Sequence, residues 1–432
     1  MSIFAGKPFK MRKKGLINNH KVLLENMSYL TVLEVFILIA PLITYPYLVR
    51  ILGMEIYGMV ITAQALASYA SKIIDFGSNR VCAKHVSINR DDANKLSEIV
   101  NSVLFVRLCL CVICLLVYIA IVIVVPIYRA YWLLFLLSYG MTLNEVLFPQ
   151  YFFQGVEKMK YSSLINIGVK SLFIALIFIF VKSREDYCIV PLFFSIGYAI
   201  AGVVSMYIVY RRMGLSFYFP KRQQMMIYVK DSSAIFATDM ICLVKDKLSY
   251  FLLGAYSGMS NVVVYDMGLK INTLLAKPVQ IISMALFPRS AKTRNIVQLR
   301  NIILFIAILT ISLVVVTNIC LSWIVQFFIH EQIDLLPLRL FSLAPIFLSV
   351  SSFMASNILV AWGYNRYVLY SIIITTSTYV LSLIVMLLTH KMGSIYSFVH
   401  LALISYFAEF VYRMLIGNRV MNIEEMNHNE KN

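Results

Sequence analysis

Three ionisable residues lie on one face of an apolar stretch between residues 262 and 287. Asp266, Lys270 and Lys277 are spaced i, i+4 and i+11, which places them on the same side of a helix. A lysine ammonium group attracts phosphate and carboxylate groups, so two lysines with one acid beside them favour the binding of an anion. We therefore predict that Lys270 and Lys277 line a wet cavity that accepts an anionic group.

The apolar stretch before it, residues 233 to 256, carries a second set of charges. Asp239 and Asp246 lie seven residues apart on one face, and Lys245 and Lys247 flank the second acid on other faces. We assign the two lysines to the same cavity. The two acids, like Asp266, are candidates for binding a coupling ion or for gating.

A third polar stripe follows one face of residues 57 to 77. It consists of Gln64, Ser68, Ser71 and Asp75, with Lys72 beside it. Glu34, in the apolar stretch before, is predicted to pair with Lys72. We assign Gln64 and Lys72 to a cavity wall, and Asp75 and Glu34 to ion coupling or gating. The residue types predict no catalytic group.

The composition shows what kind of chain must position these residues. Of 432 residues, 60% are hydrophobic and only 14% are charged, and the mean hydropathy is +0.80. Apolar runs of about 20 residues, the length that spans a bilayer, recur along nearly the whole chain. The sequence therefore predicts a polytopic membrane protein, with no interval long enough for a soluble domain.

About twelve transmembrane helices are expected from these runs. They lie near residues 29–49, 57–77, 99–125, 131–153, 161–181, 188–210, 233–256, 262–287, 301–329, 337–361, 367–389 and 394–416. We predict an all-α fold of two related six-helix bundles around a central cavity. The expected divisions are a basic N-terminal tail (1–28), an N-terminal bundle (29–210), a basic linker (211–232), a C-terminal bundle (233–416) and a C-terminal tail (417–432).

A weak internal similarity supports two related halves. Leu52-Gly53 and Leu253-Gly254 stand between the first two helices of each half, and Gly155 and Gly363 follow the fourth helix of each. Duplicated bundles of this kind are typical of transporters.

The formal charge of +17 follows the positive-inside rule. Most basic residues fall in the tails and in the polar intervals 78–98, 211–231 and 288–300, which the rule assigns to the cytoplasm with both termini. The middle interval is predicted to be an interfacial amphipathic link or, equally, a solvated linker. Anionic lipid headgroups account for this charge, so we predict membrane lipids, and no nucleic acid, as partners.

Each intramembrane charge has a structural explanation as well as a functional one. A charge near the bilayer centre costs about 2.5–3.5 kcal/mol on insertion scales, so pairing or snorkelling is favoured. We favour this structural role for Arg107, Glu145, Lys170 and Glu409, and predict that Glu145 and Lys170 neutralise each other. For Lys270 and Lys277 we favour the cavity. An acid without a cation could bind a proton, whereas a salt-bridged acid stays ionised.

No cofactor or metal is predicted. The seven cysteines lack zinc or disulfide spacing. A nucleotide-binding loop of the type G-x-x-x-x-G-K-[ST] is absent from the sequence. A cation gradient is therefore the expected energy source.

Four stretches resemble one known family. PYLVRILGMEIYGMVITAQALASYASKIIDFGSNR within residues 45–90, LFPQYFFQGVEKMKY at 147–161, Thr238-Asp239 leading through LVKDKLSYFLLG to Tyr265, and ALFPRSAK at 285–292 are similar to the polysaccharide-biosynthesis flippases. These are the Wzx-type O-antigen and oligosaccharide translocases. The four stretches cover both halves of the chain in order.

The resemblance implies the fold of the multidrug/oligosaccharidyl-lipid/polysaccharide (MOP) exporter superfamily. It implies transport of an undecaprenyl-diphosphate-linked oligosaccharide, such as an O-antigen repeat unit, from the inner to the outer leaflet of the bacterial cytoplasmic membrane. Other membrane proteins of the polysaccharide pathway would be partners. Two alternatives stay open: a drug exporter of the same superfamily, and a lipid-linked glycan polymerase or glycosyltransferase. The short outer loops disfavour an enzyme.

Overall fold

A computed structural model describes residues 16–329 and 331–429 of the chain. Every regular element in these two ranges is a helix, which confirms the predicted all-α fold. Ten helical stretches there are long and apolar enough to cross a membrane, and the first, Ser28–Ile88, contains two of the predicted spans. With α10 (Arg222–Ser257), which is richer in charge, the predicted apolar stretches all lie in mainly helical backbone.

The first two predicted spans form one continuous element, α1 (Leu16–Asp75), which changes direction at Gly53. Gly53 has φ 78° and ψ 160°, a conformation that a residue with a Cβ atom adopts only under strain. Pro41 and Pro46 lie in the first part of α1 and weaken its helical hydrogen bonding. The two spans are therefore separate helices joined without a loop.

The polar intervals predicted as connections are largely helical. Residues 78–98 contain α2 (Ser78–Ile88) and the first turn of α3 (Ala93–Val124). The amphipathic link is shorter than predicted because α10 already begins at Arg222. Likewise, α11 (Met259–Thr293) and α12 (Ile296–Ile329) cover most of the third interval, residues 288–300, with helix. Hydropathy locates the apolar part of a helix, and polar residues then continue the same helix beyond it.

The fourth helix of each half is interrupted. Residues 132–155 form several short elements, and residues 336–360 do the same. In the first half these are α5 (Trp132–Tyr139), η1 (Gly140–Thr142), α6 (Leu143–Leu147) and α7 (Gln150–Gly155); in the second, α13 (Leu336–Phe341), α14 (Ala344–Met354) and η4 (Ala355–Val360). The remaining elements are α4 (Pro126–Ala130), α8 (Met159–Phe180), η2 (Arg184–Cys188), α9 (Ile189–Tyr207), η3 (Ile208–Arg212), α15 (Asn365–Leu388) and α16 (Ile395–Asn429).

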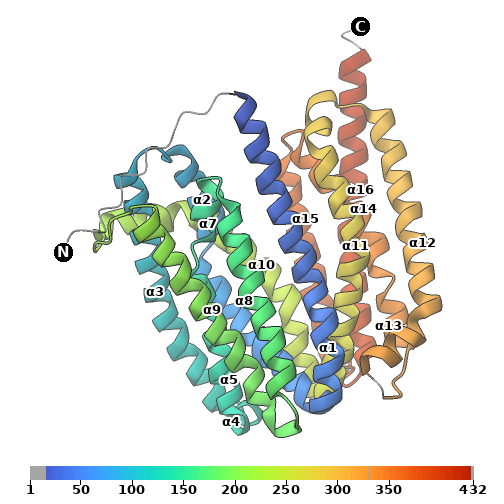
Figure 1. Ribbon diagram of the computed structural model, residues 1–432. Coiled ribbons are helices and arrows are strands. Elements are labelled where there is room, and N and C mark those ends of the chain that lie inside the picture. The colour runs from blue at the N-terminus through green and yellow to red at the C-terminus, as the bar shows by residue number, and fades with distance from the viewer. Residues whose placement is uncertain (1–15, 330, 430–432) are drawn as a thin grey trace. The chain divides into compact units, whose positions relative to one another are not determined.

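Contacts divide the chain into two compact units. The first comprises the described residues up to 53 together with 63–240, and the second comprises 54–62 and the described residues from 241 onward. In the first unit α8 packs on α9 and α2 on α7; in the second, α16 packs on α15 and on α14 (Figure 1). Both α1 and α10 contribute residues to each unit.

Backbone conformation shifts the predicted correspondence between the halves. Gly258, with φ 94° and ψ 156°, has nearly the same conformation as Gly53 and likewise joins the first two helices of its half. The predicted counterpart, Gly254, instead lies inside α10. The residue with positive φ after the fourth helix is Glu157 (φ 59°) in the first half and Gly363 (φ 89°) in the second. The counterpart of Gly363 is therefore Glu157 and not the predicted Gly155.

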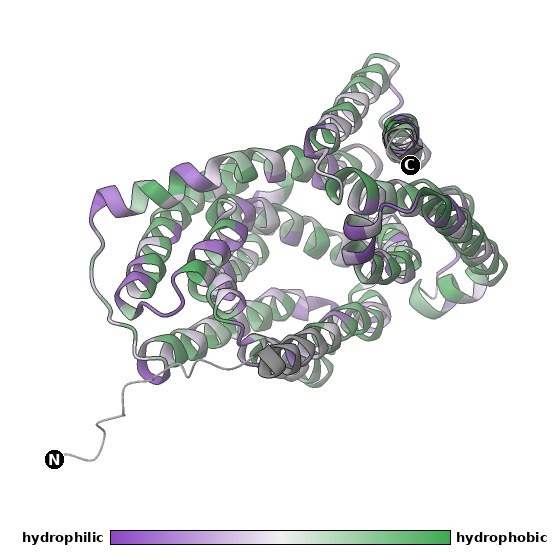
Figure 2. Cartoon of the chain, turned by 90° about the horizontal axis from the view of Figure 1, so that it is seen from above, coloured by the Kyte–Doolittle hydropathy of each residue, from purple (hydrophilic) through white to green (hydrophobic). Residues whose placement is uncertain are grey.

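Hydrophobic residues occur along most helices, with hydrophilic residues interspersed, as Figure 2 shows. Exposed side chains on α12 such as Ile308, Val315 and Trp323 suit contact with lipid. Inside a membrane, helices associate through close van der Waals packing rather than through exclusion of water. Gly197 allows such packing in the first unit, because a Cβ atom there would lie 1.4 Å from the Phe173 ring.

Candidate functional site

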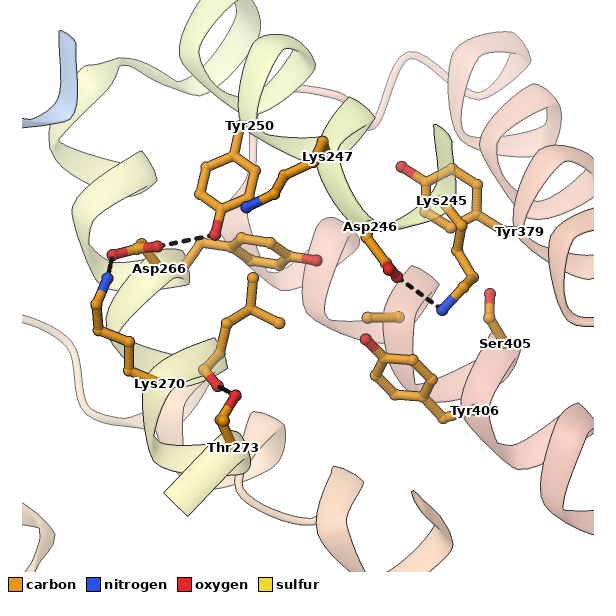
Figure 3. Close-up of a pocket in the computed structure, with 13 residues that line it drawn as sticks. Lys245, Asp246, Lys247, Tyr250, Asp266, Lys270, Thr273, Tyr379, Ser405 and Tyr406 are labelled. Carbon is orange, nitrogen blue, oxygen red and sulfur yellow. Dashed lines mark hydrogen bonds and ion pairs between the residues drawn. The ribbon is translucent and has the colours of Figure 1, made fainter. Parts of the chain in front are cut away.

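The second unit contains a cavity of about 340 Å³ between α10, α11, α15 and α16 (Figure 3). Three lysines, two aspartates and four tyrosines form most of its wall. The lining residues are Lys245, Asp246, Lys247, Tyr250, Tyr265, Asp266, Leu269, Lys270, Thr273, Tyr379, Ala402, Ser405 and Tyr406. Five of the residues predicted from the sequence therefore meet around one cavity.

On α10, three consecutive charged residues reach different parts of the cavity. Successive residues of a helix point about 100° apart, so Lys245 and Lys247 diverge. Lys245 Nζ lies 2.8 Å from Asp246 Oδ1 and 5.1 Å from the centre of the Tyr406 ring. Lys247 Nζ lies over the Tyr250 ring, 4.8 Å from its centre. Both ammonium groups are thus stabilised partly by aromatic faces.

On α11, Asp266 is the centre of a second group. Its carboxylate forms an ion pair with Lys270, one helical turn later, and accepts a hydrogen bond of 2.8 Å from the Tyr250 hydroxyl (Figure 3). The i, i+4 spacing seen in the sequence is what brings Asp266 and Lys270 together. The Asp266 side chain is only 10% exposed, so these contacts largely replace its hydration.

The cavity carries an excess of positive charge, because three lysines face two aspartates. Within the described part of the chain, Lys247 makes no ion pair within 4.0 Å, whereas Lys245 and Lys270 each have a carboxylate partner. An unpaired cation in such surroundings attracts an anion more strongly than one in water. The arrangement can therefore bind a phosphate or carboxylate group without any covalent step.

The opposite wall is built by α15 and α16 and is rich in hydroxyl groups. Tyr379 and Ser249 form a buried hydrogen bond of 2.7 Å, which fixes the Tyr379 ring. Behind this wall Glu409 accepts from Thr375 Oγ1 at 3.0 Å and pairs with Arg413 at 2.6 Å. The structural pairing predicted for Glu409 is thus confirmed.

Comparison with known proteins places the chain in a family. A family model described as "Polysaccharide biosynthesis protein" matches residues 23–294, more than half of the chain. The chain belongs to the polysaccharide biosynthesis protein family. This confirms the family that the four sequence stretches resemble.

Curated relatives of this polysaccharide biosynthesis protein are named as O-antigen transporters. One, from Escherichia coli (strain K12), is 26% identical over 365 residues, which are 81% of this chain and 86% of the relative. Another, from Shigella dysenteriae, is 27% identical over 252 residues, or 58% of this chain and 63% of the relative. The names describe transport proteins, in agreement with the predicted class, and not enzymes.

Two solved structures share the fold of this polysaccharide biosynthesis protein. One is the lipid II flippase MurJ in an inward closed conformation, with a TM-score of 0.64, 13% identity, and coverage of 89% of this chain and 86% of that chain. The other is an inward-facing multidrug resistance MATE family transporter of the MOP superfamily, with a TM-score of 0.62, 13% identity, and coverage of 89% and 99%. The chain therefore shares the fold of these two transporters, and its long apolar helices make it a multi-pass membrane protein.

The other predicted site residues of this family member lie outside the cavity wall. Lys277 is half-buried on α11, two turns beyond Lys270, and does not line the cavity. Gln64 is half-buried on α1 and accepts a hydrogen bond from Ser68 at its backbone oxygen, 2.8 Å away. Their assignment to a substrate path stays a prediction.

Two predicted charge pairs are wrong, because each member has another partner. Lys72 Nζ lies 4.0 Å from Asp239, which Arg80 also contacts at 3.3 Å, and Glu34 is instead an electrostatic neighbour of Lys170. Glu145 accepts from the Asn79 amide at 3.2 Å, not from Lys170. Two charged residues at the same depth in the membrane form a pair only if their helices turn those sides toward one another, and the sequence does not show this.

Sequence reasoning missed two features of this protein. It did not name the partner of Arg107, although the predicted pairing is confirmed: the side chain is 1% exposed and lies 2.7 Å from Asp75. It also missed the tyrosines of the cavity, because tyrosine is common in this chain and the four come from four separate helices. As for metals, the described residues contain no group of three His, Cys, Asp or Glu side chains able to hold an ion.

Proposed function

We propose that this protein is a flippase for an undecaprenyl-diphosphate-linked oligosaccharide, such as an O-antigen repeat unit. It moves this lipid from the inner to the outer leaflet of the bacterial cytoplasmic membrane by alternating access, driven by a cation gradient. Both termini then lie in the cytoplasm, in accord with the basic N-terminal tail. The names of the relatives and the shared fold of the lipid II flippase support this proposal.

The single observation that carries the proposal is the cluster of Lys245, Lys247 and Lys270 around one cavity. A diphosphate is the anionic part of the proposed lipid, and lysine is a common ligand of phosphate groups. The excess positive charge suits this anion and disfavours cationic drugs, the cargo of the alternative exporter.

The size of the cavity indicates which part of the lipid it holds. A volume of about 340 Å³ is that of a site for a small ligand. It suits the diphosphate and the sugar beside it, and not a whole oligosaccharide with its polyprenyl chain. Tyrosine and serine hydroxyls on α15 and α16 offer hydrogen bonds to that sugar.

The carboxylates differ in how well they suit ion coupling. Asp75 is buried against Arg107, and Asp239 lies between Lys72 and Arg80. Asp246 is 51% exposed, so water and ions reach it more easily than they reach Asp75 or Asp239. Of these three acids, Asp246 therefore suits gating best, and ion coupling stays assigned to Asp239, Asp266, Asp75 or Glu34.

The test replaces each cavity lysine by glutamine in a strain that lacks its own O-antigen flippase. Each charge-assisted contact contributes roughly 1.5–3 kcal/mol, so Lys245→Gln, Lys247→Gln and Lys270→Gln should each reduce surface polysaccharide about tenfold or more at equal membrane abundance. Lys182→Gln, in the exposed segment after α8, is the matched control. Export at the parental rate by all three cavity variants would refute the assignment of this cavity.

A further inference from the structure

The two lysine–aspartate pairs of the cavity hold their carboxylates with unequal strength. Asp266 pairs with Lys270, accepts from Tyr250 at 2.8 Å, and is nearly buried. Asp246 is 51% exposed, and Lys245 is the one group in the described part of the chain that donates to it (Figure 3). Asp246 can therefore leave its lysine at low cost, because half of its surface already faces solvent.

We propose that Asp246 is an internal counter-ion that occupies the position of the substrate phosphate while the cavity is empty. On binding, Lys245 exchanges the Asp246 carboxylate for a phosphate oxygen, and Asp246 turns to water. The inference rests on the proposed function and adds an autoinhibitory contact to its site.

The surroundings of Lys245 favour such an exchange. Its side chain is 15% exposed, and its ammonium group lies 5.1 Å from the centre of the Tyr406 ring, which continues to stabilise the cation when the aspartate leaves. Glu409 on α16 is a more distant electrostatic neighbour of Lys245, but Arg413 and Thr375 already hold that carboxylate. Asp246 is thus the acid next to Lys245 that is able to move.

Asp246 also lowers the net positive charge of the cavity when no substrate is bound. With Asp246 ionised, the cavity has one positive charge in excess; without it, there would be two. An unpaired charge is costly within the membrane, so an empty carrier with two of them would change conformation slowly. Asp246 should therefore weaken substrate binding while it speeds the return of the empty protein.

The experiment compares Asp246→Asn with wild type in lipid nanodiscs, using farnesyl diphosphate as the probe in calorimetric titrations. Removing the competing carboxylate should tighten binding about two- to fivefold, the size of one partly exposed ion pair. In proteoliposomes, transfer of a fluorescent prenyl diphosphate over many turnovers should fall about tenfold or more, because the return step is slowed. Glu185→Gln, at an exposed acid in the segment before α9, is the matched control and should change neither quantity.

The double variant Lys245→Gln/Asp246→Asn separates this role from a structural one. It removes the cation together with its counter-ion, so turnover should recover relative to Asp246→Asn while affinity falls below that of wild type. Equal affinity of Asp246→Asn and wild type for the diphosphate would overturn the inference alone. Failure of the wild type to bind farnesyl diphosphate would overturn the proposed function itself.

Discussion

Arg107 should be essential to the stability of the first unit. Its guanidinium donates to Asp75 Oδ1 at 2.7 Å, to Ser78 Oγ at 3.0 Å and to the Glu145 backbone oxygen at 2.6 Å. It thereby fastens α3 to both sides of the break between α1 and α2, and to α6. Replacing this residue should loosen the break, because the three acceptors have no other cation at such distances in the described residues.

The magnitude follows from burial. Arg107→Ala leaves Asp75, whose side chain is 7% exposed, as a buried charge without its partner, which costs about 3–5 kcal/mol. Arg107→Lys keeps one ion pair, but a single ammonium group cannot span the three acceptors, so we expect a loss of about 1–2 kcal/mol. Arg80→Ala is the control, because Arg80 is 68% exposed and its pair contributes at most about 1 kcal/mol.

The assay is thermal unfolding of purified protein in nanodiscs, followed by the loss of monodisperse protein. The expected order of stability is Arg80→Ala close to wild type, then Arg107→Lys, then Arg107→Ala. Adding Asp75→Asn to Arg107→Ala should restore part of the loss, because the buried charge disappears. Melting of Arg107→Ala together with the control, or no rescue by Asp75→Asn, would refute the reasoning.

Two glycines give further predictions. Gly258→Ala should cost about 1–3 kcal/mol, because φ 94° and ψ 156° suit glycine alone; thermal unfolding checks this against Gly168→Ala, a helical site with open space around it, where no loss is expected. Gly58→Ala should cost about 1–3 kcal/mol and reduce surface polysaccharide, because its Cβ would lie 2.1 Å from the Met259 backbone oxygen. Unchanged melting of Gly58→Ala would show that the packing there is looser than the distances indicate.

Hydropathy was sufficient to predict the helical class and the apolar spans, because the bilayer requires each spanning segment to satisfy its own backbone. The joining segments were predicted less well. The stretch from Arg222 to Asp231 is polar enough to resemble a linker, yet it is the first part of α10. A polar composition indicates contact with water and does not indicate backbone conformation. Composition alone therefore could not show that this stretch is helical.

Within the site, contacts along one helix were predictable and contacts between helices were not. The spacing of Asp266 and Lys270 alone predicts that they meet on α11, and they do. Tyr379 and Tyr406 lie more than a hundred residues after Asp266 and Lys270 in the sequence. Whether they reach the same cavity depends on how each helix is rotated about its axis. The same rotation decides that Glu145 faces Asn79 and not Lys170.

The two units use their buried charges for different purposes. Around Asp75 and Arg107 in the first unit, the free volume is only about 10 Å³, hardly enough for one water molecule, and the charges are held by short hydrogen bonds. Around Lys245 and Lys270 in the second unit it is about 340 Å³. A charged group whose hydrogen bonds are all made to fixed partners cannot bind a ligand, whereas a partly exposed lysine can exchange its partner for a ligand. We therefore expect loss of a cavity lysine to impair export and loss of Arg107 to impair folding.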